Sequence, residues 1–233
     1  GCKCKACRLA NIDSTRRRRP ASVLLECQGV KLLIDAGVCD FYDRFPAGTL
    51  NYILLTQYKV DNLLGLYDIR SGANVSIRVI GPNDPESCTD LQQYPGILNF
   101  EQKAFPLESF HLNPFNITPL PLQKSRAILG YLVSCHGKCL AYLPDTAALD
   151  DALVNNLREA RVDMLFVDSH TPYQDLPSGD NDMARALRVH NGCLTKKTIL
   201  THLGHDMDNW LIEYGDTLPF DIEPAQEGQI LML

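Results

Sequence analysis

The chain has 233 residues, of which 45% are hydrophobic, and its 22 basic and 28 acidic residues give a net charge of −6 at pH 7. A chain of this size and composition buries one sizeable core, so we expect a single domain over residues 1–233. The acidic balance argues against a nucleic-acid or membrane-surface binder. No apolar run approaches the ~18 residues of a membrane span and no signal-peptide pattern opens the sequence, which predicts a soluble protein.

Nine cysteines are an odd number, and their scatter is unlike the paired framework of a small secreted domain. A reducing cytoplasm is therefore the expected location. Cys2, Cys4 and Cys7 form a C-x-C-x-x-C pattern, which is typical of tetrahedral zinc sites but is one ligand short. Cys135 and Cys139 flank "HGK" between two apolar runs, where we favour a hairpin turn over a metal site.

In chain order, the run Arg16–Arg19 is expected to be a solvated loop before Pro20. Apolar alternation and turn residues then predict a hairpin over 21–37 and strands over 51–56 and 75–82, with a leucine-rich helix over 60–70 between them. Short irregular strands are expected between Phe105 and Lys124, followed by a second hairpin over 127–146.

The last third of the chain alternates helix and strand patterns. Helices are predicted over 150–160, 181–190 and 206–215, the last one capped by Gly215, and strands over 162–170 and 197–205. A final hairpin is expected over 221–233. Two sheets between helices would accommodate this order, which places the chain in the α/β class.

Polar residues stand at the carboxyl ends of the predicted buried strands: Asp35, Gln57, Asp145, Asp168 and His202. In layered α/β folds these strand ends are where sites are built. Together they predict a cleft.

Long stretches of the chain, from Gly1 almost to the end, resemble the metallo-β-lactamase superfamily and in particular its PhnP-type phosphodiesterases of phosphonate breakdown. The resemblance is carried by "GCKCKAC", "RRPASVLLECQGVKLLIDAGV", "LLTQYKVDNLLGL", "GPNDPESCTDLQQYPGILNF", "ITPLPLQKSRAILGYL", "LPDTAAL", "VDSHTPY" and "ILTHLGHDMDNWL". It implies an αββα sandwich. The family's first glycine-rich strand would precede Gly1, and we expect either that it was removed or that this chain does without it.

In the family, a turn reading H-x-H-x-D-H places ligands around two divalent ions that activate a water and bind a phosphodiester. This chain has "QYKVDN" there. Gln57, Lys59 and Asn62 stand at histidine positions, while Asp61 is kept.

The resemblance also places the family's other site residues. A metal histidine falls on Lys124, the bridging aspartate is kept as Asp145, and the last metal histidine is kept as His202. The histidine that resembles a general acid falls on Asp180, and nearby His170 is the other acid candidate.

By resemblance, the first metal position would see Gln57, Lys59, Lys124 and Asp145. A lysine is protonated at neutral pH, so this set does not make a transition-metal site. The second would see Asp61, Asn62, Asp145 and His202, which would hold magnesium or manganese weakly. We expect Lys59 or Lys124 to contact Asp145 or Asp61, because buried lysines need carboxylate partners.

The family completes its cysteine cluster with a histidine that corresponds to His205. All four structural ligands, Cys2, Cys4, Cys7 and His205, are present and imply one zinc in an N-terminal loop over residues 1–7.

We therefore favour a pseudoenzyme that binds a protein partner or a small phosphate-containing ligand. The first alternative is a weak or single-metal phosphodiesterase acting on cyclic or nucleotide-like phosphodiesters, and the second is a cofactor-biosynthesis protein like PqqB. A homodimer is left open, and neither nucleic acid nor a membrane is expected as a partner.

Overall fold

The structure is a computed structural model, and it describes residues 1–20, 22–46, 48–84, 87–122, 127–146, 149–173 and 181–233. These residues form two compact units. The first unit comprises the described residues of 1–19, 122 and 136–233, and the second those of 20–121 and 127–135. The predicted α/β class is confirmed, whereas a single domain over 1–233 remains a prediction.

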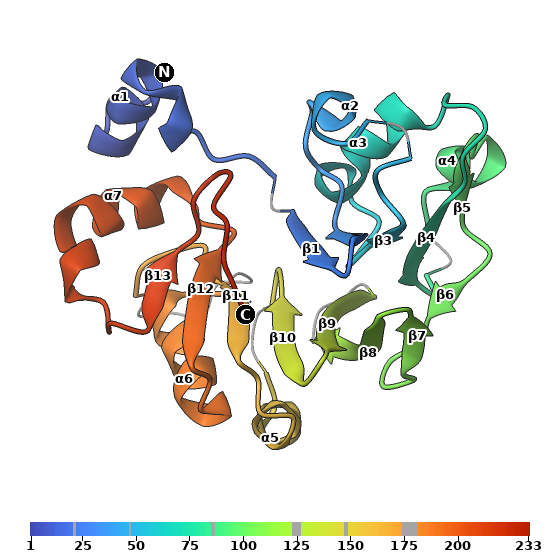
Figure 1. Ribbon diagram of the computed structural model, residues 1–233. Helices are drawn as coiled ribbons and strands as arrows, with labels where there is room; N and C mark the ends of the chain where they lie inside the picture. Colours follow the sequence, from blue (N-terminus) through green and yellow to red (C-terminus); the bar gives the residue numbers. More distant parts are fainter. Residues whose placement is uncertain (21, 47, 85–86, 123–126, 147–148, 174–180) are drawn as a thin grey trace. The chain divides into compact units, whose positions relative to one another are not determined.

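The second unit is built on the sheet β1-β2-β3-β4-β5, with β6 also paired to β4 (Figure 1). β1 and β2 are antiparallel, as the predicted hairpin requires, and β2, β3 and β4 run parallel. The elements of this unit are β1 (Val23–Cys27), β2 (Val30–Ile34), α2 (Phe41–Arg44), β3 (Tyr52–Leu54), α3 (Val60–Ile69), β4 (Ile77–Pro82), α4 (Thr89–Gln93), β5 (Leu98–Asn99), β6 (Lys103–Ala104), β7 (Phe110–Leu112), β8 (Phe115–Leu122) and β9 (Ile128–Cys135).

A continuous apolar core joins this sheet to helices α2 and α3. Leu33 and Ile53 from the strands and Phe41 and Leu66 from the helices are at most 1% exposed. Gly65 is required where α3 crosses the chain after β2, because a Cβ there would lie 2.2 Å from the Phe41 ring. The leucine spacing that predicts α3 therefore corresponds to its buried face.

The first unit contains parallel strands in the order β13-β12-β11-β10. Its elements are α1 (Lys5–Ile12), the 3-10 turn η1 (Ser14–Arg16), β10 (Lys138–Leu143), α5 (Asp151–Glu159), β11 (Met164–Asp168), α6 (Met183–Cys193), β12 (Lys197–Thr201), α7 (His205–Tyr214), the 3-10 turn η2 (Gly215–Thr217) and β13 (Ile222–Pro224). Asp150 and Asp182 cap the amino ends of α5 and α6. The helices predicted over 150–160, 181–190 and 206–215 and the strands predicted over 162–170 and 197–205 are confirmed, with small differences at their ends.

The final hairpin predicted over 221–233 is wrong. Only β13 forms there, and it pairs in parallel with β12. Pro224 lacks the N–H that a second strand would use, and the chain beyond it is bound to the arginine segment near the N-terminus instead. Gly215 is the C-cap of α7 but has right-handed backbone angles, so the chain continues into η2 rather than reversing there.

Within the described residues, no helix is long and apolar enough to cross a membrane.

Candidate functional site

The four predicted zinc ligands lie together in the first unit. The metal-binding atoms of Cys2, Cys4, Cys7 and His205 are all within 4.8 Å of one another. His205 Nδ1 lies 3.7 Å from the sulfur of Cys4 and 3.3 Å from that of Cys7. Zinc bonds of ~2.3 Å to sulfur and ~2.0 Å to nitrogen give tetrahedron edges of roughly 3.5–3.8 Å, so this donor set fits zinc.

The protonation of the thiols is shared across the cluster. The backbone N–H of Cys7 donates to the Cys4 sulfur, with a further contribution from Asn209, and this lowers the pKa of Cys4 to about 6. The hydrogen bond between the Cys7 and Cys4 side chains raises the pKa of the Cys7 thiol to about 11. A divalent cation would replace the shared proton, because thiolates are the metal-binding form.

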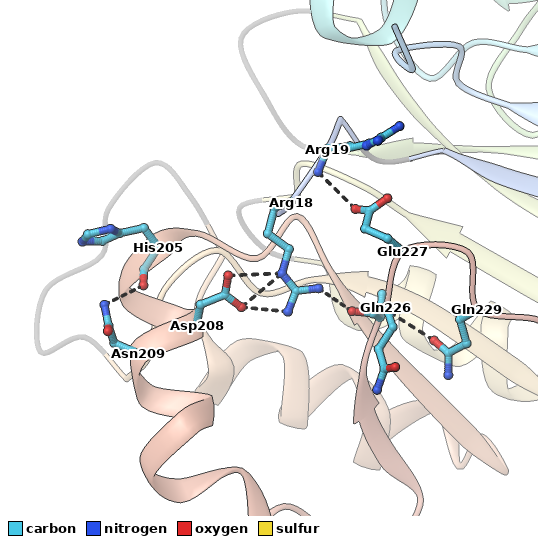
Figure 2. Close-up of polar contacts among 9 residues, drawn as sticks. Arg18, Arg19, His205, Asp208, Asn209, Gln226, Glu227 and Gln229 are labelled. Carbon is cyan, nitrogen blue, oxygen red and sulfur yellow. Dashed lines mark hydrogen bonds and ion pairs between the residues drawn. The ribbon is translucent and has the colours of Figure 1, made fainter. Parts of the chain in front are cut away.

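Neighbouring residues orient these ligands. Cys4 is the N-cap of α1, and His205 is the first residue of α7. His205 Nε2 lies 3.0 Å from the Asp206 carboxylate, which directs Nδ1 toward the sulfurs. Asn209 accepts from the Ala6 N–H at 2.9 Å and donates to the His205 carbonyl at 3.0 Å (Figure 2).

An arginine fixes the next turn of α7. Arg18 forms a bidentate pair with Asp208, with Nη2 2.7 Å from Oδ1, and also donates to the Ala225 carbonyl (Figure 2). The Arg19 N–H donates to Glu227 at 3.1 Å. The arginine run is thus not simply a solvated loop, because Arg18 joins α7 to the C-terminal segment.

In the second unit, a buried carboxyl group organises the turn over residues 56–62, which the resemblance aligns with the family's metal-binding motif. Asp35 follows β2 and has no solvent exposure. It accepts from the Thr56 N–H at 2.9 Å and from the Thr56 hydroxyl at 2.9 Å. Burial raises the pKa of Asp35 to about 7, although the bonds from Thr56 act in the opposite direction.

The backbone around Asp35 is closely packed against the start of α3. Asp35 itself has φ of 59°, and the Ala36 N–H donates to the Asn62 carbonyl at 2.8 Å. Only glycine fits at position 37, because a Cβ there would lie 1.7 Å from the Asp61 carbonyl oxygen. These contacts hold the turn over residues 56–62 without any metal-binding side chain.

The substituted residues of this turn have different surroundings. Gln57 and Asn62 are each 4% exposed, Lys59 is half-buried and Asp61 is exposed. Asn62 Nδ2 donates to the Thr56 hydroxyl at 3.3 Å. Its Oδ1 is buried, and no donor within the described residues reaches it, so an oxygen ligand is available at this position.

The retained residues of the first unit also lie at strand ends. Asp145 and His202 have φ of 47° and 52°, the left-handed region that non-glycine residues rarely adopt. His170 Nδ1 lies 3.2 Å from the His202 carbonyl, and the Thr201 hydroxyl lies 3.2 Å from His202 Nδ1. Such backbone outliers are common at functional sites.

Asp168 is 2% exposed at the end of β11, and its carbonyl accepts from Asn181 at 2.6 Å. Lys124 and Asp180 lie outside the described residues. The expected lysine–carboxylate contacts and the choice between Asp180 and His170 as acid therefore stay predictions.

Several supporting residues were missed by sequence reasoning. Arg18 and Asn209 contact residues that are distant in the sequence and adjacent only in the fold. Asp206 contacts its neighbour His205, but this contact depends on the side-chain rotamers. The left-handed angle of Asp35 is likewise invisible in a pattern of residue types. The position of Asp35 at the end of a predicted strand identifies it as a candidate site residue, but the sequence gives no indication that Thr56 is its hydrogen-bond partner.

Comparison with known proteins adds family information. The family described as Beta-lactamase superfamily domain matches residues 31–203. No curated protein sequence matches the chain significantly.

Solved structures resemble the whole chain. A new diphosphatase from the PhnP family is 24% identical, with a TM-score of 0.83, covering 100% of this chain and 91% of that one. Zinc-bound PqqB from Methylobacterium extorquens is 18% identical, with a TM-score of 0.79 and coverage of 100% and 94%. The metallo-beta-lactamase fold protein YhfI from Bacillus subtilis is 18% identical, with a TM-score of 0.77 and coverage of 91% of each chain. These likenesses confirm the expected αββα fold.

The zinc cluster is tested by Cys4→Ser. Serine keeps an acceptor for the Cys7 N–H, so the cap of α1 survives while one sulfur ligand is lost. After dialysis against a chelator, the variant is expected to hold far less than the one zinc per chain of the parent and to melt at a lower temperature. Cys39→Ser, at an exposed cysteine outside the cluster, is the control. Equal zinc content in the parent and Cys4→Ser would contradict the site.

The buried carboxyl predicts a pH-dependent stability. Between pH 4 and 7 the folded state binds the Asp35 proton more tightly than the unfolded state does, so stability falls as pH rises through this window. The effect is at most ~4 kcal/mol. Asp35→Asn mimics the protonated form, so urea unfolding should show the parent losing stability relative to it from pH 5 to pH 8. The exposed Asp43→Asn serves as control. If the difference in the free energy of unfolding between the parent and Asp35→Asn stays constant with pH, the prediction is wrong.

Proposed function

Since this chain belongs to the metallo-β-lactamase superfamily and is close to its PhnP branch, we propose that it is a PhnP-like pseudoenzyme. It keeps the fold and one structural zinc at Cys2, Cys4, Cys7 and His205, and it acts by binding a small phosphate-containing ligand or a protein partner. The observation that supports this proposal is the turn held by Asp35, where the resemblance aligns Gln57, Lys59 and Asn62 with the family's histidines.

Side-chain chemistry supports the loss of catalysis. Hydrolysis by two ions requires ligands that offer lone pairs and remain bound while water is deprotonated. A lysine ammonium offers no lone pair, and an amide is a weaker ligand than imidazole for transition metals. The turn is nevertheless ordered by Asp35 and Thr56, so its new side chains occupy a defined backbone.

A second candidate function is favoured by the buried, unsatisfied Oδ1 of Asn62. An oxygen ligand suits magnesium or manganese, and Asp61, Asn62, Asp145 and His202 are the residues that would hold one ion. When bound, the ion would polarise a phosphodiester, with Asp180 or His170 as the acid. In this alternative the chain is a weak, single-metal phosphodiesterase.

The PqqB-like alternative rests on fold likeness, which is compatible with many functions. Cytoplasmic location, phosphonate metabolism and a homodimer are likewise proposals for this chain.

Activity separates the first two candidates. With excess manganese, the purified chain is expected to hydrolyse activated phosphodiesters and ribosyl cyclic phosphates far more slowly than the ~1 to 10³ per second usual for enzymes. The measurement is product release from bis-p-nitrophenyl phosphate and from a ribosyl cyclic phosphate. Turnover within the usual range that is lost in His202→Ala would establish the phosphodiesterase instead.

Restoring the ligands tests the alignment of the pocket. A variant combining Gln57→His, Lys59→His, Asn62→His and Lys124→His should gain thermal stability on titration with manganese or zinc, because metal binds only the folded state. At one hundred times the dissociation constant the gain is about 2.7 kcal/mol. The parent and Gln57→His alone are the controls and should respond much less. A restored variant that ignores metal would show that these positions do not form the family's site.

A further inference from the structure

A cavity of about 390 Å³ lies in the first unit between helices α5 and α6. Three arginines line it, namely Arg158 from α5 and Arg185 and Arg188 from α6, against one lining carboxylate, Asp151. The remaining described lining residues are uncharged. In a chain with a net charge of −6 this is a local concentration of positive charge.

Helical spacing directs the arginines to this cavity. Arg185 and Arg188 are three residues apart on α6, and Asn155 and Arg158 are three apart on α5, so each pair lies on one helix face. Gly192 brings the two helices close, because a Cβ there would lie 2.5 Å from Val154 Cγ1. The two helices thus present their basic side chains to one space.

Two carboxylates near the cavity, Asp150 and Asp182, are engaged with the backbone. Asp150 accepts from the Leu153 N–H at 2.7 Å, and Asp182 accepts from the Arg185 N–H at 2.9 Å. The Arg158 guanidinium donates to Asn155, which is uncharged. Arg188 is exposed and makes no ion pair within the described part of the chain. Arg158 and Arg188 therefore keep donors for an added anion.

The cavity also reaches the carboxyl ends of two parallel strands. Its lining includes Thr146, which follows β10, and Asn181, which lies before α6. Asn181 is 1% exposed, and its Oδ1 is buried without a donor among the described residues. This is the end of a parallel sheet at which α/β proteins bind ligands.

We propose that the α5–α6 cavity is a binding site for a small phosphorylated compound whose phosphate is held by Arg158 and Arg188. Two guanidinium groups match the oxygens of a phosphate through paired N–H donors. The volume lies within the range of small-molecule sites. None of the lining residues is a former metal ligand, so the site stands independently of the proposed function.

The test uses inorganic pyrophosphate as the probe and the zinc-loaded full chain, with binding measured by calorimetry. The parent is expected to bind pyrophosphate saturably at one site per chain, more weakly as salt rises. The double variant Arg158→Gln with Arg188→Gln should bind at least tenfold more weakly, since both charged hydrogen-bond donors are gone. Its zinc content and circular dichroism spectrum should match those of the parent.

Two single variants complete the design. Arg161→Gln removes the same charge just beyond α5 and outside the cavity, and it should bind pyrophosphate like the parent. Lys59→Gln alters the turn over residues 56–62 and reports whether the anion binds there instead of in the cavity. The proposal is overturned if the parent does not bind saturably, if the double variant binds as tightly as the parent, or if Arg161→Gln weakens binding to the same extent. Loss of binding in Lys59→Gln alone would move the anion to the metal turn, and this would overturn the cavity assignment without affecting the proposed function.

Discussion

Much of the second unit is arranged around a carboxyl group that water does not reach. Asp35 ends β2 with a left-handed backbone, accepts two bonds from Thr56, and brings Ala36 and Gly37 against the start of α3. Burial of a carboxyl group is unfavourable unless its hydrogen bonds are made, so the turn over 56–62 is constrained to one conformation. This constraint operates through the backbone and Thr56. The side chains of Gln57, Lys59 and Asn62 can therefore be replaced without loss of the turn's backbone conformation.

The first unit depends on contacts between distant parts of the chain instead. The cluster of Cys2, Cys4, Cys7 and His205 joins residues 2–7 to the start of α7, while Arg18 joins Asp208, one turn further along that helix, to Ala225. Arg18 and Asp208 are partly shielded from solvent and paired in a bidentate geometry, which favours a net contribution from this ion pair. The cysteine–histidine cluster and one ion pair contact the same helix, so the N-terminal segment has two independent attachments to it.

How much of the structure can be predicted from the sequence depends on how far apart in the sequence the interacting residues lie. Local signals succeed: the leucine spacing of α3, the aspartate caps of α5 and α6 and the β1–β2 hairpin all depend on neighbouring residues. Arg18 and Asp208 are 190 positions apart, and no local pattern distinguishes a pairing arginine from a solvated one. The C-terminal segment looked like a hairpin for the same reason. Its apolar residues suggest a strand, but the Ala225 carbonyl and the Glu227 side chain accept hydrogen bonds from Arg18 and Arg19.

The proposed function separates two properties that a divalent ion combines in this family. An ion supplies positive charge that attracts a phosphodiester, and it also lowers the pKa of a bound water so that hydroxide is available. Lysine supplies charge only, since its ammonium binds no water as a Lewis acid. By the proposed alignment, two lysines and two aspartates would sum to about zero, whereas two divalent ions with the same aspartates would leave a surplus of positive charge. In the proposed pseudoenzyme this substitution would weaken the attraction for phosphate and abolish the activation of water, which is the chemistry expected of a binding protein derived from a hydrolase.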